Sequence, residues 1–501
     1  MSAEHTVDTI GISTSLFISG EHRRGGAGKL PIVDPGTGKQ IGTVELASEA
    51  DVQDALEAAS QAFPAWSQTL PSQRGAILKR AARLLLERAD DAASVLTTEA
   101  GKTRVEARGE IGRAIETLMW NGEQAGRIEG RIIAGAADGS VRYSIPTPLG
   151  VVAAFTAWNF PAVLGSRKLG SALAAGCTVV LKAAESAPAT AAIIVQALAD
   201  SGLPNGVVNL IFGDPPAVAK QLLSSPVVKA ATFTGSTAVG RSLAALAAPR
   251  LIRCVFELGG HAPVIVCQDA NIDTVIATTS PAKFGSAGQS CVAPTRYIVH
   301  RSLYEQFAEK LAAYAQSLTL GHGHDTDTTL GAVANQGRVD TLKRLTDDAV
   351  ARGARLVTGG AQAELDGFFF EPTVLADVPT DADIMTEEPF GPIAALIAYD
   401  EFDEAIELAN ATDYGFAAYL FTDSLRRRNQ AIDQLKAGNI GINQMAPSLP
   451  DAPLGGIAAS GLGYEGGTEG ILSFMQLRLV SQSAPRDTGS TRDSASRRQH
   501  T

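Results

Sequence analysis

Cys291 is the side chain whose surroundings most favour covalent chemistry. It lies in GSAGQSCVAPTRYIV, where glycines and small residues surround one thiol between two apolar segments. A glycine-rich backbone lets N–H groups come close to a bound oxyanion, which a thiol nucleophile attacking a carbonyl requires. The alternative is a packed and inert thiol, which is the commoner fate of an isolated cysteine. Cys291 is therefore a candidate nucleophile that needs partners from elsewhere in the chain.

Glu257 and Asn159 are the candidate partners of this thiol. Glu257 lies in CVFELGGHAP, where an acid interrupts an apolar strand and two glycines follow. Burial raises the pKa of such a carboxyl group, as a general base working near neutral pH requires, although a strand-end ion pair is the alternative. Asn159 follows Trp158 in TAWNFP, and its amide can donate to an oxyanion without carrying charge; the alternative is a turn residue.

Further polar side chains and glycines occur at the ends of expected strands. Lys182 and Glu185 follow an apolar run in VLKAAES, and the turn from Gly235 to Gly240 opens a helix. Free N–H groups at a helix N-terminus attract phosphate, and a cation beside a carboxylate can bind ribose hydroxyls. Ligands gather at the carboxyl ends of parallel strands, so these residues predict a nucleotide site.

The elements that must position these residues alternate regularly between residues 150 and 248. Apolar runs without polar alternation indicate strands of a parallel sheet covered by helices on both faces. The expected strands are 150–158, 177–183, 206–213 and 228–235, and the helices between and after them are 167–176, 189–202, 216–225 and 237–248. Short connections favour a doubly wound α/β domain.

The rest of the chain predicts a second α/β domain and two peripheral parts. Hairpins and long helices (51–63 and 74–96) precede the alternating region, and a second α/β series starts at APVIVC after residue 260. The apolar segment ILSFMQLRLVSQ predicts an edge strand able to pair with another chain. The polar end of the chain, 483–501, has the composition of a disordered tail.

Composition excludes several classes of protein. The net charge of −11 argues against a nucleic-acid binder, because phosphate binding requires clustered Lys and Arg. No apolar run is long enough for a membrane span, and the N-terminus lacks the pattern of a signal peptide. The four cysteines are scattered along the chain, so no disulfide framework is expected. The seven histidines lack the spacing of metal ligands, so no metal site is expected. We therefore expect a cytoplasmic protein with its thiols reduced.

Together these stretches identify a family. PLGVVAAFTAWNFP, VLKAAESAPA, FTGSTAVG, FELGGHAP, GQSCVAPTR and EEPFGPI resemble the aldehyde dehydrogenase superfamily in order and spacing, and the resemblance extends to about residue 480. It implies NAD-dependent oxidation of an aldehyde to a carboxylic acid through a thioester on Cys291. In that reading Glu257 is the base, and Asn159 with the Cys291 backbone N–H forms the oxyanion hole. NAD is expected rather than NADP, because Glu185 would repel the extra phosphate.

The resemblance also assigns cofactor residues and domains. The cofactor residues it implies are Thr156, Ala157, Trp158, Lys182, Glu185, Gly235, Ser236, Gly240, Leu258, Glu388 and Phe390. The domains it implies are an NAD-binding Rossmann-type domain (1–130 and 148–258), a catalytic α/β domain (259–448), a small β arm for oligomerisation (131–147 and 472–482) and a C-terminal loop near the active site (449–471). Members of the family form homodimers or homotetramers.

The substrate is left between two classes of aldehyde. LGGHAP and NQMAPSLPDAP are similar to segments of succinate- and 2-oxoglutarate-semialdehyde dehydrogenases, and Arg167 matches an arginine that binds the distal carboxylate there; a surface ion pair is the alternative. A second arginine, six residues before the nucleophile in succinate-semialdehyde enzymes, is Gly285 here. Leu454 and Ala458 also replace a usual Phe and Lys, which favours a bulkier aromatic or aliphatic aldehyde.

Two other classes of protein use the same residues differently. A thiol hydrolase or acyltransferase would pair Cys291 with His261 or His300, and a structural homologue of the fold would have no activity. The hydrolase leaves the nucleotide-like strand ends unexplained. Intact Cys291, Glu257 and Asn159 argue against an inactive protein.

Overall fold

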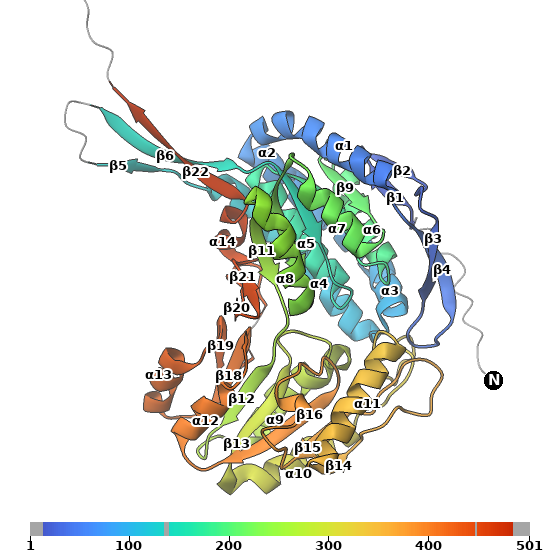
Figure 1. The fold of residues 1–501 in the computed structure, drawn as a ribbon, viewed down its shortest axis with the longest axis vertical. Coiled ribbons are helices and arrows are strands. Elements are labelled where there is room, and N and C mark those ends of the chain that lie inside the picture. The colour runs from blue at the N-terminus through green and yellow to red at the C-terminus, as the bar shows by residue number, and fades with distance from the viewer. Residues whose placement is uncertain (1–13, 135–139, 446–447, 484–501) are drawn as a thin grey trace, which may run out of the picture.

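The computed structural model describes residues 14–134, 140–445 and 448–483 of the chain. Two α/β parts lie one above the other in Figure 1, and a narrow β arm projects from the upper part. The upper part is built on an eight-stranded sheet and the lower part on a seven-stranded sheet. The fold is thus the expected Rossmann-type parallel sheet with a second α/β part. Residues 484–501, which cover nearly all of the expected disordered tail, lie outside the described residues.

The upper sheet has the strand order β2-β1-β9-β8-β7-β10-β11-β21. Its five central strands are parallel and almost wholly buried, which explains why their sequences lack polar alternation. They are β7 (Val151–Phe155), β8 (Thr178–Lys182), β9 (Val208–Ile211), β10 (Val228–Thr234) and β11 (Arg253–Glu257). Because β8 and β9 extend to one side of β7 while β10 and β11 extend to the other, the switch point lies between β7 and β10.

Four helices connect these strands and cover the sheet. They are α5 (Pro161–Ala175), α6 (Pro188–Asp200), α7 (Pro215–Ser224) and α8 (Thr237–Ala247). The first three start with proline, whose fixed φ suits the first helical position. The expected alternation of strands and helices between 150 and 248 is confirmed.

The segment before the alternating region adds edge strands and helices to the upper part. The strands are β1 (Leu16–Ile18), β2 (Glu21–Arg23), β3 (Lys29–Val33) and β4 (Gln40–Glu45), and the helices are α1 (Glu49–Gln68), α2 (Pro71–Glu87), α3 (Ala89–Ala100) and α4 (Arg104–Gln124). The expectation of one helix over 74–96 is wrong, because Arg88 leaves the helical conformation. Two aspartates follow at once, and acids stabilise the first turn of a new helix.

The lower sheet has the order β14-β15-β16-β13-β12-β18-β19 and is parallel except at β14. Its strands are β12 (Ala262–Val266), β13 (Pro294–His300), β14 (Arg355–Thr358), β15 (Thr373–Ala376), β16 (Ile393–Tyr399), β18 (Ala417–Phe421) and β19 (Asn439–Ile442). Its helices are α9 (Ile272–Phe284), α10 (Tyr304–Gln316), α11 (Gln336–Ala351), α12 (Phe402–Ala409) and α13 (Leu425–Gln434).

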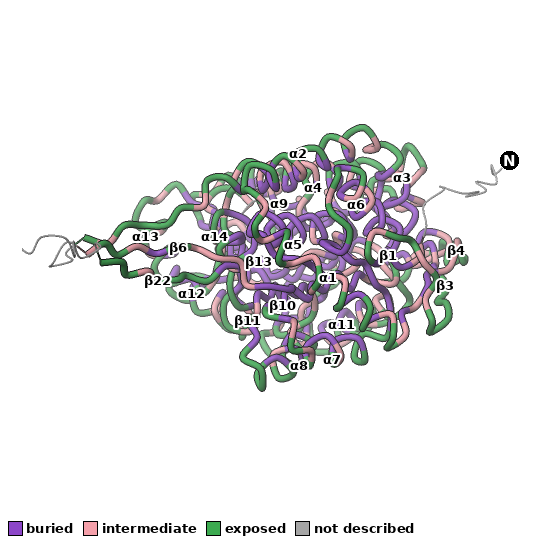
Figure 2. Tube along the Cα trace, turned by 90° about the horizontal axis from the view of Figure 1, so that it is seen from above, coloured by how far each residue is buried: buried purple, intermediate pink, exposed green. Residues whose placement is uncertain are grey.

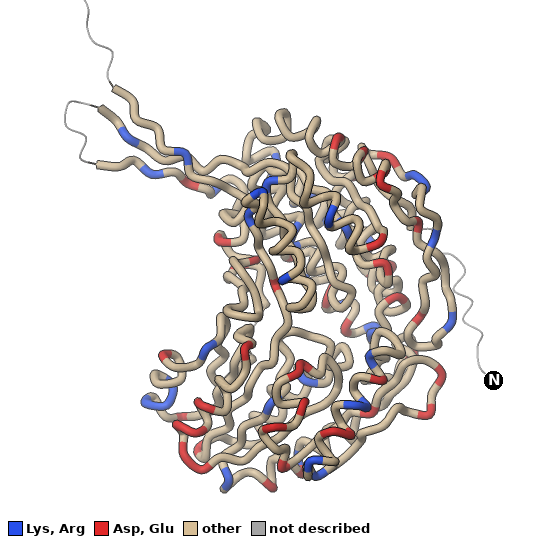
Figure 3. The backbone as a smooth tube through the Cα atoms, viewed as in Figure 1, with Lys and Arg blue, Asp and Glu red and all other residues tan. Residues whose placement is uncertain are grey.

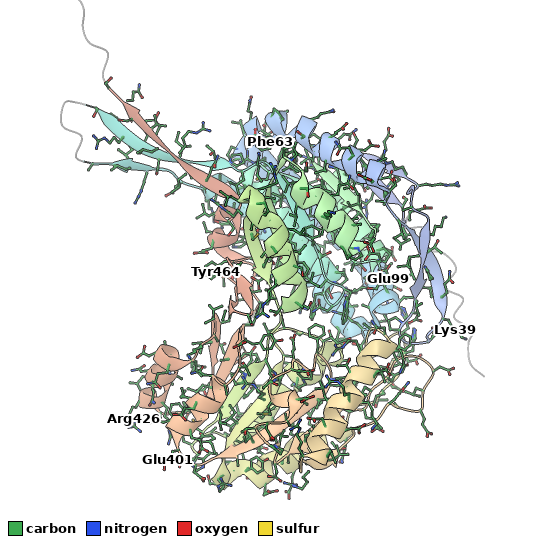
Figure 4. All side chains as sticks on the ribbon, in the orientation of Figure 1. Lys39, Phe63, Glu99, Glu401, Arg426 and Tyr464 are labelled. Atoms are coloured by element: carbon green, nitrogen blue, oxygen red, sulfur yellow. The ribbon has the colours of Figure 1, made fainter. Side chains whose placement is uncertain are left out.

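The arm is a three-stranded antiparallel sheet, β22-β6-β5, formed by β22 (Met475–Gln482), β6 (Val141–Pro148) and β5 (Arg131–Ile133). Figure 2 shows the arm as a mixture of exposed and partly buried residues, with β22 mostly exposed, while the two α/β parts have buried interiors. Basic residues predominate along it, whereas the lower end of the molecule carries many acidic residues interspersed with basic ones (Figure 3). Its side chains project into solvent on both sides (Figure 4).

The segment before β22 returns the chain to the upper sheet. It contains β20 (Ile457–Ala458), which pairs with β17 (Tyr414–Gly415), then β21 (Gly461–Leu462) and α14 (Gly467–Leu472). β21 pairs with the end of β11, so the expected C-terminal loop supplies an edge strand. Tyr464, half-exposed beside this strand, is labelled in Figure 4. Within the described residues, no helix combines the length and apolarity needed to cross a membrane.

Candidate active site

A cavity of about 510 Å³ brings Cys291, Glu257 and Asn159 together. Both α/β parts and the C-terminal segment contribute to its wall. Its lining is mostly apolar, with Phe160, Leu164, Phe416, Tyr419, Met445 and Leu454 among the larger side chains. The three candidate catalytic residues, remote in sequence, thus line one cavity of the size that takes a small molecule.

Glu257 ends β11 with a carboxyl group that is buried and free of hydrogen bonds. Only 2% of the residue is exposed, and neither side-chain oxygen has a partner. Burial raises the pKa of Glu257 well above its usual value, and the nearby Glu465 raises it further. Lys168 and Arg167 oppose this rise. This environment favours the neutral form of the Glu257 carboxyl group.

Cys291 and Asn159 approach each other across the turn that precedes the cysteine. The Asn159 Nδ2 donates to the carbonyl of Gln289 at 3.1 Å, two residues before Cys291, while its buried Oδ1 has no partner. Burial raises the pKa of the Cys291 thiol, and Glu257 and Glu388 raise it further. The thiol is therefore neutral at rest even though the charge of Arg167 lowers its pKa, and it must lose its proton before it can attack.

The expected nucleotide residues Lys182, Gly235 and Ser236 lie at the carboxyl ends of β8 and β10, the two strands that flank β7. Ser236 caps α8, its hydroxyl accepting from the Val239 N–H, and Gly235 precedes it directly after β10. Lys182 ends β8 and forms an ion pair of 2.7 Å with Glu185, whose Oε1 also accepts from the Gly213 N–H. This edge offers a helix N-terminus, a cation and a carboxylate in one place, as a dinucleotide requires.

The remaining expected cofactor residues complete the same region. Gly240 lies against Leu258, so a side chain there would collide with the leucine. Glu388 accepts from the Gly260 N–H at 3.0 Å, and burial raises its pKa to about 7. Phe390 packs edge-to-face on Trp158 with ring centroids 5.6 Å apart.

Thr156 and Ala157 form the turn between β7 and Trp158, where the Thr156 N–H donates to the Lys182 carbonyl. The region formed by these residues offers backbone N–H donors, small residues and the carboxylates of Glu185 and Glu388, and this set fits a nicotinamide dinucleotide.

Comparison with known proteins decides the family. The profile of the aldehyde dehydrogenase family matches residues 22–480. The chain belongs to the aldehyde dehydrogenase family. It is 44% identical over 93% of its length to 4-(hydroxymethyl)benzenesulfonate dehydrogenase of Comamonas testosteroni, covering 97% of that protein. It is 39% identical over 93% of its length to glutarate-semialdehyde dehydrogenase of Pseudomonas putida, covering 96% of it.

A solved structure gives the same result. Succinate-semialdehyde dehydrogenase from Burkholderia pseudomallei superposes with a TM-score of 0.93 at 39% identity, over 94% of this chain and 98% of that one. As a member of this family, the protein is an oxidoreductase that oxidises aldehydes with NAD or NADP. The expectation of an aldehyde dehydrogenase close to the semialdehyde branch is confirmed.

The rival thiol hydrolase needs a histidine beside Cys291. His261 is buried and bonded on both ring nitrogens, to the Thr295 hydroxyl and the Ile384 carbonyl, and His300 bonds to Ser302. Neither histidine is among the residues that line the cavity. The inactive homologue lacks support because the enzyme keeps all three candidate catalytic residues in one cavity.

Sequence reasoning missed a buried ion pair beneath Glu257. The Lys168 ammonium donates to Glu465 and, at 2.8 Å, to the Thr234 hydroxyl. Glu465 lines the cavity beside Glu257, and its second oxygen has no partner. The signal available was a lysine on a helix composed mostly of apolar and small residues. Glu465, in a glycine-rich stretch near the chain end, gave no such signal.

Proposed function

We propose that this enzyme oxidises an anionic aldehyde to its acid through a thioester on Cys291. The observation that supports it is the single cavity lined by Cys291, Glu257 and Asn159. A sulfur nucleophile, a carboxyl group with a raised pKa and an uncharged amide donor are the three groups that such a reaction needs.

The proposed steps use the chemistry of these residues in turn. The Cys291 thiol first loses its proton to solvent. Its thiolate then adds to the carbonyl carbon, and the Asn159 Nδ2 with the Cys291 backbone N–H stabilises the alkoxide. A bound nicotinamide supplies the hydride acceptor, so the thiohemiacetal becomes a thioester. Glu257 then takes a proton from water, and the resulting hydroxide attacks the thioester to release the acid and the thiolate.

Arg167 is the proposed contact for the substrate anion. Its Nη2 donates to the Ser448 carbonyl at 2.8 Å and to the Ser448 hydroxyl, while its buried Nε has no partner. A guanidinium that lines the cavity with a free donor suits a carboxylate, which it can bind through two hydrogen bonds. A semialdehyde such as succinate, glutarate or 2-oxoglutarate semialdehyde is the first candidate, in keeping with the names of the relatives.

A bulkier aromatic aldehyde is the second candidate. The relative from Comamonas testosteroni, at 44% identity, is named for a substituted benzenesulfonate. The aromatic walls provided by Phe160, Phe416 and Tyr419 suit a ring, and Gly285 and Leu454 leave room for one. Both candidates share a distal anion opposite the aldehyde.

Cofactor preference, assembly and location extend the proposal. NAD is favoured over NADP because the Glu185 carboxylate would repel a ribose phosphate. A homodimer or homotetramer is supported by the exposed apolar side chains of the arm, among them Ile132, Leu477 and Leu479. The cytoplasm is the proposed location, since all four cysteines carry free thiols and the mechanism uses one of them.

Substitution of the nucleophile and the base tests the proposal. Cys291→Ala should lower steady-state NADH formation from an aldehyde by at least about a thousandfold while NAD still binds, measured by fluorescence titration. Glu257→Gln should keep a burst of NADH near one equivalent per site and lose most of the steady-state rate, because water is no longer activated. Undiminished steady-state turnover of either variant would exclude its assigned role.

A further inference from the structure

Arg113 adds a second guanidinium to the wall of the cavity, on the side formed by α4. Val105, Glu106, Gly109 and Arg113 all line the cavity, and their spacing places them along one face of that helix. The Arg113 Nη1 lies 3.9 Å from the position that a Cβ of Gly109 would occupy, so the side chain leans back over the glycine. Arg113 is therefore held along the cavity wall and not directed away from it.

The aromatic ring of Phe160 helps to hold this guanidinium. The Arg113 Cζ lies 5.8 Å from the ring centroid, and the Lys102 ammonium lies 3.6 Å from it. A cation near the face of a ring is attracted by its quadrupole. Phe160 lines the cavity itself, so the contact keeps Arg113 next to the space that a substrate occupies.

The acids on the same helix are committed elsewhere. Both Glu106 oxygens accept hydrogen bonds, one from the Ser286 N–H and the other from Thr103, and Glu110 pairs with Lys102. Within the described parts of the chain, Arg113 forms no ion pair with a carboxylate. Its charge is thus left for solvent or for a ligand.

Arg113 and Arg167 are close enough to influence each other. Burial is the main cause that lowers the pKa of Arg167, and Arg113 lowers it further. Arg167 also keeps its buried Nε free. Two cations on one apolar cavity repel each other, and an anion between or beside them would offset that repulsion.

We propose that Arg113 is a specificity-determining residue that binds the distal carboxylate or sulfonate of an aromatic aldehyde whose carbonyl lies at Cys291. This inference rests on the proposed function and assigns the outer anion contact to a side chain that the sequence did not single out. Arg167, held by Ser448, serves the anion of a shorter aldehyde, whereas an anion carried across a ring reaches Arg113. Succinate-semialdehyde enzymes carry a second arginine at the position of Gly285, which has no charge here. In this proposal Arg113 on α4 provides the second positive charge instead.

Three aldehydes and three variants of the full-length enzyme test this assignment. 4-Carboxybenzaldehyde, benzaldehyde and succinate semialdehyde serve as substrates, and NADH formation gives kcat and KM for each. Arg113→Ala should lower kcat/KM for 4-carboxybenzaldehyde by about 10- to 100-fold, chiefly through KM, because a charge-assisted contact is lost. The values for the other two aldehydes should stay within about twofold. Arg113→Lys, which keeps the charge without the fork, should give an intermediate loss.

Arg108→Ala is the matched control, since Arg108 lies on the same helix, is exposed and pairs with Asp90. It should leave all three substrates unaffected, and thermal melting should show both alanine variants folded. Equal losses on all three aldehydes, or no loss on 4-carboxybenzaldehyde, would overturn the role of Arg113. A folded wild-type enzyme that reduces NAD or NADP with none of the aldehydes would instead overturn the proposed function.

Discussion

Glu257 is costly to bury, but the same burial raises the pKa of its carboxyl group, as a general base requires. A buried carboxyl group without hydrogen bonds is costly to keep, and the charges near it are those of Glu465, Lys168 and Arg167. The balance raises its pKa, which favours the neutral form and makes the carboxylate a stronger base once it has ionised.

The pH dependence of turnover follows from this shift. Because the pKa of Glu257 is raised, its ionised and catalytically active form increases as pH rises, so the deacylation rate should still be increasing with pH above the range in which an ordinary carboxyl group has finished ionising. In Glu257→Gln the residual rate should lack the levelling-off that marks completed ionisation. Stopped-flow separation of burst and steady-state phases checks this, and a wild-type deacylation rate that falls over the same range would contradict it.

The sequence singled out the three candidate catalytic residues by their local settings: Glu257 ends an apolar run, Asn159 follows one and Cys291 lies in a glycine-rich stretch. The structure places all three on one cavity. Lys168 and Glu465 were missed for a physical reason: their pairing joins residues 297 positions apart and depends on where β21 and α14 pack. Arg113 was missed because an exposed arginine on an amphipathic helix has no feature that distinguishes it from a solvent-facing one.

Elements of the upper part follow closely from periodicity. Fully buried parallel strands have unbroken apolar runs, so β7, β8 and β10 were predictable within a residue or two at most ends. The break between α2 and α3 and the pairing of β21 with β11 were not predictable. They depend on tertiary contacts that a single apolar pattern does not encode.

The crossing of α2 and α4 is an element-scale feature that supports the site. Gly75 and Gly122 face each other there, and a Cβ at Gly75 would collide with the Gly122 carbonyl oxygen. Because α4 carries Glu106 and Arg113, the close approach of these helices fixes one wall of the cavity.

Gly75→Ala should therefore destabilise the enzyme by about 1–3 kcal/mol, since the helices must separate to admit the methyl group. Gly112→Ala on α4 is the matched control, because nothing lies within 4 Å of its Cβ position. Alanine there should leave stability unchanged or raise it by up to about 1 kcal/mol, because it removes glycine's backbone freedom. Urea unfolding checks both, and equal stability of the two variants would contradict the packing argument.

At the scale of the whole molecule, the arm is notable because it exposes apolar side chains that a single chain leaves in contact with solvent. Its register places Leu477 and Leu479 on one face, and Ile132, Val141 and Ile145 on the other, all of them exposed. One edge of β22 also has no neighbouring strand within the described residues. Exposed apolar side chains on an open strand edge favour pairing with another copy.

Replacing Leu477 and Leu479 together by Asp should lower the oligomeric state, because buried charges at a subunit contact are costly. Light scattering coupled to size-exclusion chromatography measures the mass. Leu425→Asp on α13, an exposed leucine far from the arm, is the control and should leave the mass unchanged. An unaltered mass of the arm variant would remove β22 from the contact.

The late position of Glu465 and β21 has a consequence for how the enzyme is made. During synthesis the thiol at 291 and the carboxyl group at 257 leave the ribosome well before the segment that closes the sheet edge and pairs with Lys168. A growing chain therefore holds its reactive groups without a finished cavity, and chemistry begins only when translation is nearly complete.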